Sequence, residues 1–208
     1  MIELVGYRLA GWDTPFWVLP NRRAGRYNEA GAGSTQYLSL HPLTPWAEYM
    51  RNEGIVTAED AAEARPPLWA ARVLLAEEPP RVTFDSAAEW GLEPAELVAD
   101  DRTACQRLAR ELRADPQAPD AFIAVSAALP GTENLVMLAP RVMVSYLLEP
   151  LDDLDVPASV AAEDGRAPPG LVDLVHHFGS AGPHPGLAAW ERGEPYELVE
   201  PSTAHLAA

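Results

Sequence analysis

The chain has 208 residues, of which 48% are apolar, so it is long enough to bury a core of ordinary size as one domain with an appendage. Its formal net charge of −16 disfavours a surface that follows nucleic acid phosphates, because such surfaces are basic. No apolar run has the length of a membrane span, and Glu3 stands where a secretion signal carries basic residues. We therefore expect a cytoplasmic protein with no nucleic acid partner and no membrane contact.

Metal and disulfide chemistry is also disfavoured. Cys105 is the only cysteine, which excludes an internal disulfide and a cysteine-based metal cluster. His176 and His177 are adjacent, so on a helix their side chains point to different sides, and no third ligand stands at a suitable spacing. We expect no metal site.

The chain begins with a strand and a long loop. Alternating apolar residues predict a strand over 2–9, which leaves Arg8 at its end, either facing a cleft or on the surface. The segment that follows, to residue 34, is rich in turn residues and has no sustained period, and ordered loops of this length are usually functional. Over the first 26 residues only Glu3 and Asp13 oppose four arginines, which predicts an anion-attracting patch: Arg8, Arg22, Arg23 and Arg26.

The next segments alternate between short strands and short helices. We expect a strand over 36–40, and then a helix over 42–52 with Pro42 or Pro45 in its first turn. A second helix is expected over 57–64, capped by Thr57 with Asp60 three residues later.

The middle of the chain predicts two strands, over 68–76 and 81–85, and then helices over 86–92 and 103–115. The longer helix places Cys105, Leu108 and Leu112 on one face. Its arginines are expected to be solvated and to form no site: Arg102, Arg107, Arg110 and Arg113.

The last predicted strands precede a change in composition. A short buried strand over 121–127 delivers Ser126 at its end, and two more strands are expected over 134–138 and 141–148. Residues 148–208 hold 11 acidic side chains and two arginines, with scattered proline and glycine. We therefore expect a domain over 1–147 and an acidic extension over 148–208, whose apolar pieces form short helices that dock back.

Three residues at equal spacing suit one chemical task. Arg26, Tyr37 and Glu48 follow one another at intervals of eleven. Arginine presents paired donors to phosphate oxygens, tyrosine offers a flat face to an aromatic ring, and a carboxylate stabilises a sugar cation. A nicotinamide dinucleotide carries all three partners. The alternative for Glu48 is a surface ion pair with Arg51, three residues further along the same helix.

Over residues 1–147 the sequence resembles the RES domain family, named for its arginine, glutamate and serine. The resemblance rests on several motifs in the same order: Gly25-Arg26-Tyr27-Asn28, Gly31 or Gly33, Tyr37-Leu38-Ser39, Ala47-Glu48, Val125-Ser126-Ala127, Pro130-Gly131 and Asn134-Leu135-Val136. The family usually has Gly-Gly-Arg-Trp-Asn where this chain has Ala24-Gly25-Arg26-Tyr27-Asn28. Residues 148–208 match no known pattern.

The resemblance implies an α+β fold of the ADP-ribosyltransferase type, with a mixed, mainly antiparallel split β-sheet and flanking helices. It implies a toxin of a bacterial toxin–antitoxin pair that degrades NAD, its substrate, and that is silenced by an Xre-type antitoxin. No cofactor is implied, and a homodimer remains open. The catalytic residues it implies are Arg26, Tyr37 and Glu48, and the substrate-binding residues are Arg8, Arg23, Tyr27, Asn28 and Ser126.

The acceptor of the ADP-ribosyl group is not determined by these motifs. Water or phosphate as acceptor gives an enzyme that depletes NAD, whereas a protein side chain gives a protein ADP-ribosyltransferase toxin. A third alternative is a catalytically silent module that binds NAD or a basic partner.

Overall fold

The structure is a computed structural model of the chain and describes residues 1–10, 21–138, 146–150 and 166–201, the strand at 146–150 by its backbone alone. Part of the predicted N-terminal loop, and most of the strand predicted over 141–148, lie outside the described residues. None of the described helices has the length and apolar character that a membrane span requires.

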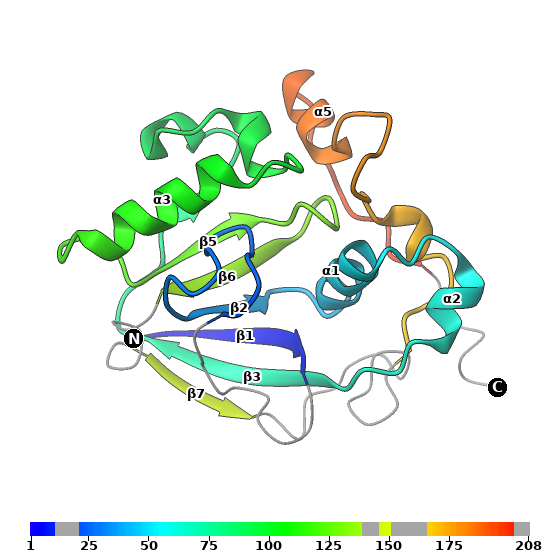
Figure 1. The fold of residues 1–208 in the computed structure, drawn as a ribbon, viewed down its shortest axis with the longest axis horizontal. Coiled ribbons are helices and arrows are strands. Elements are labelled where there is room, and N and C mark those ends of the chain that lie inside the picture. The colour runs from blue at the N-terminus through cyan, green and yellow to red at the C-terminus, as the bar shows by residue number, and fades with distance from the viewer. Residues whose placement is uncertain (11–20, 139–145, 151–165, 202–208) are drawn as a thin grey trace.

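Seven strands of the described chain form one sheet in the order β4-β5-β6-β2-β1-β3-β7 (Figure 1). All neighbouring strands are antiparallel except β4 and β5, which are parallel. The strands are β1 (Ile2–Leu9), β2 (Thr35–Ser39), β3 (Leu68–Leu75), β4 (Arg81–Val82), β5 (Ala121–Val125), β6 (Glu133–Leu138) and β7 (Tyr146–Pro150).

The sheet is divided near its middle, between β1 and β2. These two strands are joined by a single register pair, Tyr7 with Ser39, whereas β1 pairs with β3 along its whole length and β2 with β6 along its whole length. Two half-sheets, β4-β5-β6-β2 and β1-β3-β7, therefore meet at one point. The predicted α+β class with a mainly antiparallel split sheet is confirmed.

Helices lie beside both halves of the sheet. Figure 1 shows α3 over β5 and β6, and α1 beyond the end of β2. The helices are α1 (Thr44–Glu53), α2 (Ala58–Glu63), α3 (Thr103–Ala114) and α5 (Pro185–Glu191), with 3-10 turns η1 (Ala87–Trp90), η2 (Pro94–Leu97) and η4 (Val172–Leu174).

Local signals explain where the first two helices begin and end. Pro45 lies in the first turn of α1, where no backbone N–H is needed, and Gly54 ends the helix in the left-handed conformation with φ of 71°. The Thr57 hydroxyl caps α2 by accepting a hydrogen bond from the Asp60 N–H at 3.1 Å. The predicted positions of α1, α2 and α3 are confirmed to within two residues.

The strand predicted over 81–85 is wrong beyond Val82, and the helix predicted over 86–92 is a single 3-10 turn. The Ser86 hydroxyl accepts from the Thr83 N–H and donates to the Arg81 carbonyl, both at 2.9 Å. This serine-centred turn competes with the strand for the same backbone groups and ends it early.

The C-terminal segment 166–201 contributes to the hydrophobic core. Leu171 is fully buried in one cluster with Trp46 of α1, and Leu187 of α5 joins a second cluster with Phe122 of β5. The two short helical pieces predicted in this segment therefore pack against both α1 and the sheet.

We expect Leu171→Ala to lower the free energy of unfolding by about 2–5 kcal/mol, because it opens a cavity among residues that cannot close it. Urea unfolding of the full chain measures the change. Val199→Ala is the control, since Val199 is 79% exposed and its truncation should change the value by less than about 0.5 kcal/mol. If Leu171→Ala changed the free energy of unfolding as little as Val199→Ala does, this would contradict the packing of Leu171 in the core.

Candidate active site

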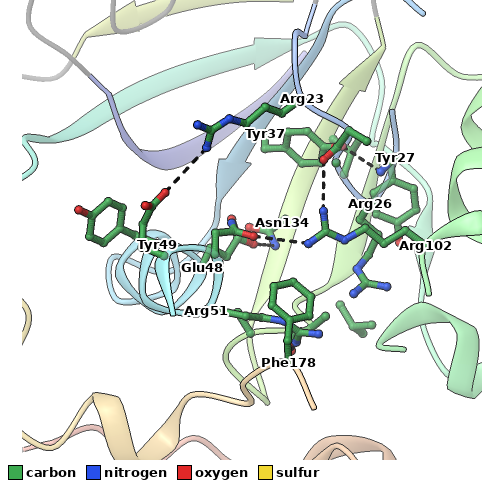
Figure 2. Close-up of a pocket in the computed structure, with 18 residues that line it drawn as sticks. Arg23, Arg26, Tyr27, Tyr37, Glu48, Tyr49, Arg51, Arg102, Asn134 and Phe178 are labelled. Carbon is green, nitrogen blue, oxygen red and sulfur yellow. Dashed lines mark hydrogen bonds and ion pairs between the residues drawn. The ribbon is translucent and has the colours of Figure 1, made fainter. Parts of the chain in front are cut away.

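A cleft opens beside the division of the sheet. Its larger part is a cavity of about 560 Å³ between the segment 23–27, helix α1 and the adjoining ends of β5 and β6 (Figure 2). A second cavity of about 230 Å³ continues from it to the end of β1. The two cavities share Tyr37, Glu48, Tyr49 and Asn52. The two cavities are therefore neighbours, and together they extend from one half-sheet to the other.

The larger cavity carries a local excess of positive charge. Four arginines line it, together with two glutamates: Arg23, Arg26, Arg51, Arg102, Glu48 and Glu53. The chain as a whole has a net charge of −16, so the sign is reversed here. We predicted an anion-attracting patch from the N-terminal arginines, but half of the arginines in the cavity come from elsewhere in the chain.

Glu48 projects from α1 and is held by a side chain of the sheet. The Asn134 Nδ2 donates to Glu48 Oε1 at 2.7 Å, and the Asn134 Oδ1 accepts from the Ser39 hydroxyl at 2.7 Å. An ionised carboxylate only accepts hydrogen bonds, so the amide must turn its NH₂ group toward Glu48. Ser39 and Asn134 are register partners on β2 and β6, which makes the sheet itself the support for the carboxylate.

Burial raises the pKa of Glu48 above its ordinary value. The hydrogen bond from Asn134 and the charges of Arg26 and Arg51 oppose this rise without cancelling it. The carboxylate is therefore less hydrated and a better proton acceptor than an exposed glutamate. The alternative of a surface pair with Arg51 does not describe the site, because Arg51 bonds to Asp100.

Tyr37 of β2 fixes the loop that carries Arg26. Its hydroxyl donates to Asn28 Oδ1 and accepts from the Tyr27 N–H, both at 2.9 Å. A Cβ on Gly25 would lie 2.9 Å from this hydroxyl and would collide with the Asn28 amide, so the loop needs glycine at that position. Burial raises the pKa of Tyr37, which keeps the hydroxyl protonated as a donor.

Tyr27 and Asn28 are both buried beneath the loop, and of the two only Tyr27 borders the larger cavity. Tyr27 is 2% exposed and packs edge-on against Phe122 with ring centroids 4.9 Å apart. Asn28 is 1% exposed and donates to the Arg23 carbonyl at 3.0 Å. We predicted substrate contacts for both residues. Asn28 lines neither cavity of the cleft and shapes the loop, whereas the prediction for Tyr27 stays a prediction.

Arg26 and Arg23 both reach the cavity, with different surroundings. Arg26 donates to the Ala99 carbonyl at 2.8 Å and to the Glu96 carbonyl at 3.5 Å, which uses two of its five N–H donors. The Arg23 side chain is 94% exposed and lies 4.0 Å from Glu53. Arg26 is therefore pre-positioned by the protein, whereas Arg23 is held by one exposed ion pair.

The other two predicted substrate contacts lie apart from the main cavity. Arg8 lines the smaller cavity, at the end of β1. Ser126 is 1% exposed, and its hydroxyl accepts from the N–H groups of Ala128 and Leu129, both at 3.2 Å. Ser126 thus stabilises the turn after β5, and the structure does not bring its hydroxyl to the cleft.

Two arginines of the cleft were missed by sequence reasoning. Arg51 is 4% exposed, and it bonds to Asp100 at 2.8 Å and to the Ala127 carbonyl. Burial, and then the charge of Arg26, lower the pKa of Arg51 to about 10. Arg102, which we expected to be solvated, lines the cavity and donates to the Ala24 carbonyl at 3.2 Å and to Asn52 at 3.4 Å.

The prediction of a solvated Arg113 is also wrong, because this side chain donates to the Tyr27 carbonyl and to the Thr35 hydroxyl. For Arg51 a sequence signal existed, since it stands one helical turn after Glu48 on the same face. Asn134 also stood within a recognised motif. Arg102 and Arg113 carry no such signal. Only the docking of α3 against the loop places Arg102 at the cavity and Arg113 beside the Tyr27 carbonyl.

Within the described residues, no group of three histidine, cysteine, aspartate or glutamate side chains is arranged to hold a metal ion.

The fold is an α+β domain in which a split, mainly antiparallel sheet opens onto a cleft. The chain belongs to the RES domain family, whose sequence model matches residues 7–158. It is similar in structure to a chain of the M. tuberculosis MbcT–MbcA toxin–antitoxin complex, with a TM-score of 0.58 and 20% sequence identity, over 74% of this chain and 85% of that chain. No match was found among curated protein sequences.

We expect Asn134→Ala to raise the pKa of Glu48 further, because it removes the hydrogen bond that favours the ionised form. The carboxyl ¹³C chemical shift of Glu48, followed by NMR through a pH titration, measures the pKa directly. Ser39→Ala should produce a smaller shift in the same direction, since it only frees the amide to rotate. An unchanged pKa in Asn134→Ala would contradict the support that this amide gives.

Proposed function

We propose that this protein is a toxin of a toxin–antitoxin pair that depletes NAD by cleaving the bond between nicotinamide and ribose. One observation carries the proposal: Arg26, Tyr37 and Glu48 line the same cavity, although each comes from a different part of the chain. Membership of the RES family and the fold shared with a toxin–antitoxin complex support it.

The chemistry follows from where charge develops. Breaking the N-glycosidic bond passes through an oxocarbenium-like state with positive charge on the ribose, and a nearby carboxylate lowers the barrier. Glu48 fits this role because it is partly desolvated, so its charge acts in a medium of low dielectric constant. Asn134 would hold the carboxylate in one orientation as the charge appears.

The arginines of the cleft would bind the two phosphate groups of NAD. The guanidinium groups of Arg26, Arg51 and Arg102 border the cavity that Glu48 also borders. In the free protein, burial and then the charge of Arg26 lower the pKa of Arg51 and Arg102. A pyrophosphate carries two negative charges and would relieve the mutual repulsion of these cations. Tyr37 would pack against the nicotinamide or its ribose with its ring, while its hydroxyl holds the loop.

We further propose that an antitoxin of the Xre type silences the protein by covering the cleft. The cleft is open at the surface and carries the opposite sign of charge to the rest of the chain, so an acidic segment would bind there. Water or phosphate is the proposed acceptor.

We expect purified protein to release nicotinamide from NAD, and Glu48→Gln and Arg26→Ala to lower the rate by about 100-fold or more, as the loss of one such electrostatic group does. Glu63→Gln and Arg65→Ala, which change exposed residues at α2 and just after it, are the matched controls and should keep the rate. Chromatography of the products with and without phosphate identifies the acceptor. Undiminished turnover by either site variant, or no turnover by the unmodified protein, would refute the assignment.

The pH dependence of the reaction should also report Glu48. The carboxylate is needed ionised, and its pKa is raised, so the rate should fall as the pH drops through that raised pKa and the side chain becomes protonated. Asn134→Ala should move this acidic limb to higher pH.

Glu48→Gln should not lower the thermal stability at neutral pH, because it replaces a desolvated charge with a neutral amide.

A further inference from the structure

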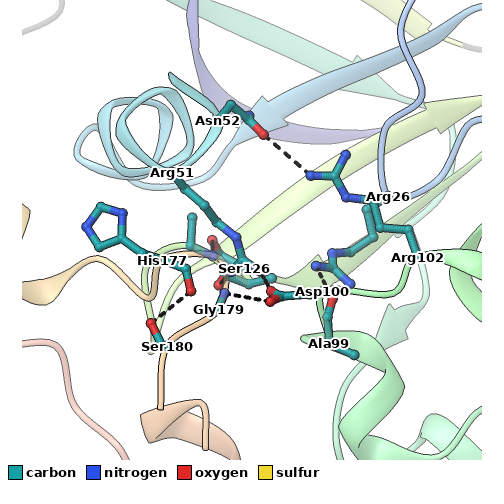
Figure 3. A network of polar contacts seen from close by, with 12 residues as sticks. Arg26, Arg51, Asn52, Ala99, Asp100, Arg102, Ser126, His177, Gly179 and Ser180 are labelled. Atoms are coloured by element: carbon teal, nitrogen blue, oxygen red, sulfur yellow. Dashed lines mark hydrogen bonds and ion pairs between the residues drawn. The ribbon is translucent and has the colours of Figure 1, made fainter. Parts of the chain in front are cut away.

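The C-terminal segment reaches the cleft from outside the part of the chain that the family model matches, which ends at residue 158. Residues 176–179 are fixed at two points by their backbone, one of which is the bond between Gly179 and Asp100 that Figure 3 shows. The His176 N–H donates to the Ala128 carbonyl, and the Gly179 N–H donates to Asp100 Oδ2, both at 2.8 Å. Phe178 lies between these two anchors, so its position at the cleft is determined by the main chain.

The Phe178 ring borders the large cavity and touches two of its cations. Its centroid lies 4.4 Å from the Arg51 Cζ and 5.1 Å from the Arg102 Cζ, within the range of cation–π contacts. Phe178 is nevertheless 41% exposed, at the start of a run of exposed residues over 178–183. An apolar ring therefore stands at the edge of an arginine-lined cavity with much of its surface still open to water.

Holding the arginines in place does not account for this ring. Arg51 is already held by Asp100 and by the Ala127 carbonyl, and Arg102 is already held by the Ala24 carbonyl and Asn52. Contact with the ring therefore adds little to the positioning of these two arginines. What it does add is a flat apolar surface next to groups that attract phosphate, and a nucleotide combines those two features in one molecule.

We propose that Phe178 is a wall of the substrate cleft against which a planar ring of the nucleotide packs, so that a segment beyond the family-matched region completes the site. The ligand is a ring-bearing phosphate, and it is one end of NAD if the proposed function, on which this assignment rests, is correct. The ring would cover the exposed part of Phe178, while Arg51 or Arg102 meets the phosphate.

Isothermal titration tests the proposal with three ligands: AMP, NMN and inorganic pyrophosphate. Each ligand is titrated into two full-length proteins, one with Glu48→Gln alone and one with both Glu48→Gln and Phe178→Ala. The Glu48→Gln substitution prevents turnover of NMN. We expect Phe178→Ala to weaken AMP or NMN by about 5- to 150-fold, the range for loss of one aromatic stacking partner, and to leave pyrophosphate within about twofold. The ligand that weakens identifies the ring, adenine or nicotinamide.

Two further variants separate stacking from other effects. Phe178→Trp should keep the affinity, and Phe178→Leu should lose most of it, because leucine keeps the apolar bulk without the flat face. Tyr196→Ala is the matched control, an aromatic of the same segment that is 36% exposed and does not line the cavity. Circular dichroism and thermal unfolding of every variant check the fold.

The results separate this inference from the proposed function. An equal loss of pyrophosphate binding in Phe178→Ala would overturn the proposal, since it would mean that the ring only holds the arginines. Unchanged binding of both AMP and NMN would overturn it as well. If Phe178→Ala weakens AMP or NMN but the unmodified protein releases no nicotinamide from NAD, the proposed reaction is refuted. The proposal that Phe178 binds a nucleotide ring is then still supported.

Discussion

The hydrogen bond from Asn134 to Glu48 links the sheet, helix α1 and the cleft. A carboxylate that has lost much of its water is costly unless polar groups replace the water, and here one amide, itself anchored to Ser39, supplies the nearest replacement. Because Ser39 and Asn134 face one another across β2 and β6, a slip of one residue in that register would turn the amide to the opposite face. The orientation of Glu48 therefore depends on correct pairing of two strands far apart in sequence.

The loop that carries Arg26 obeys a similar constraint. Tyr37 holds it from the strand, Asn28 closes it from within, and Gly25 leaves the space that both need. Arg113 of α3 adds a bond to the Tyr27 carbonyl. In this chain the motif Gly25-Arg26-Tyr27-Asn28 thus builds the loop, and its first three residues also border the cavity.

The cleft differs in charge from the rest of the protein. Four arginines against two glutamates form a basic patch in an acidic protein, which attracts anions while the rest of the surface repels them. Asp100 reduces the repulsion between the arginines by pairing with Arg51. Its second carboxylate oxygen accepts a hydrogen bond from the Gly179 N–H. One carboxylate therefore joins the charge balance of the cleft to the docking of the C-terminal segment.

The sequence by itself determined the elements whose signals are local. The alternation over residues 2–9, the prolines at the start of α1, and the apolar face of α3 predicted real elements because periodicity and capping act over a few residues. The spacing of Arg26, Tyr37 and Glu48, read with the family resemblance, also indicated three residues that line one cavity.

Only the tertiary structure decided which other side chains reach that cavity. Ser126 looked suited to a ligand but is used by its own turn, whereas Arg102 and Phe178 reach the cavity only by packing between segments far apart in the chain. The physical reason is that burial and desolvation depend on which elements meet, and long-range packing sets those meetings without a local trace in the chain.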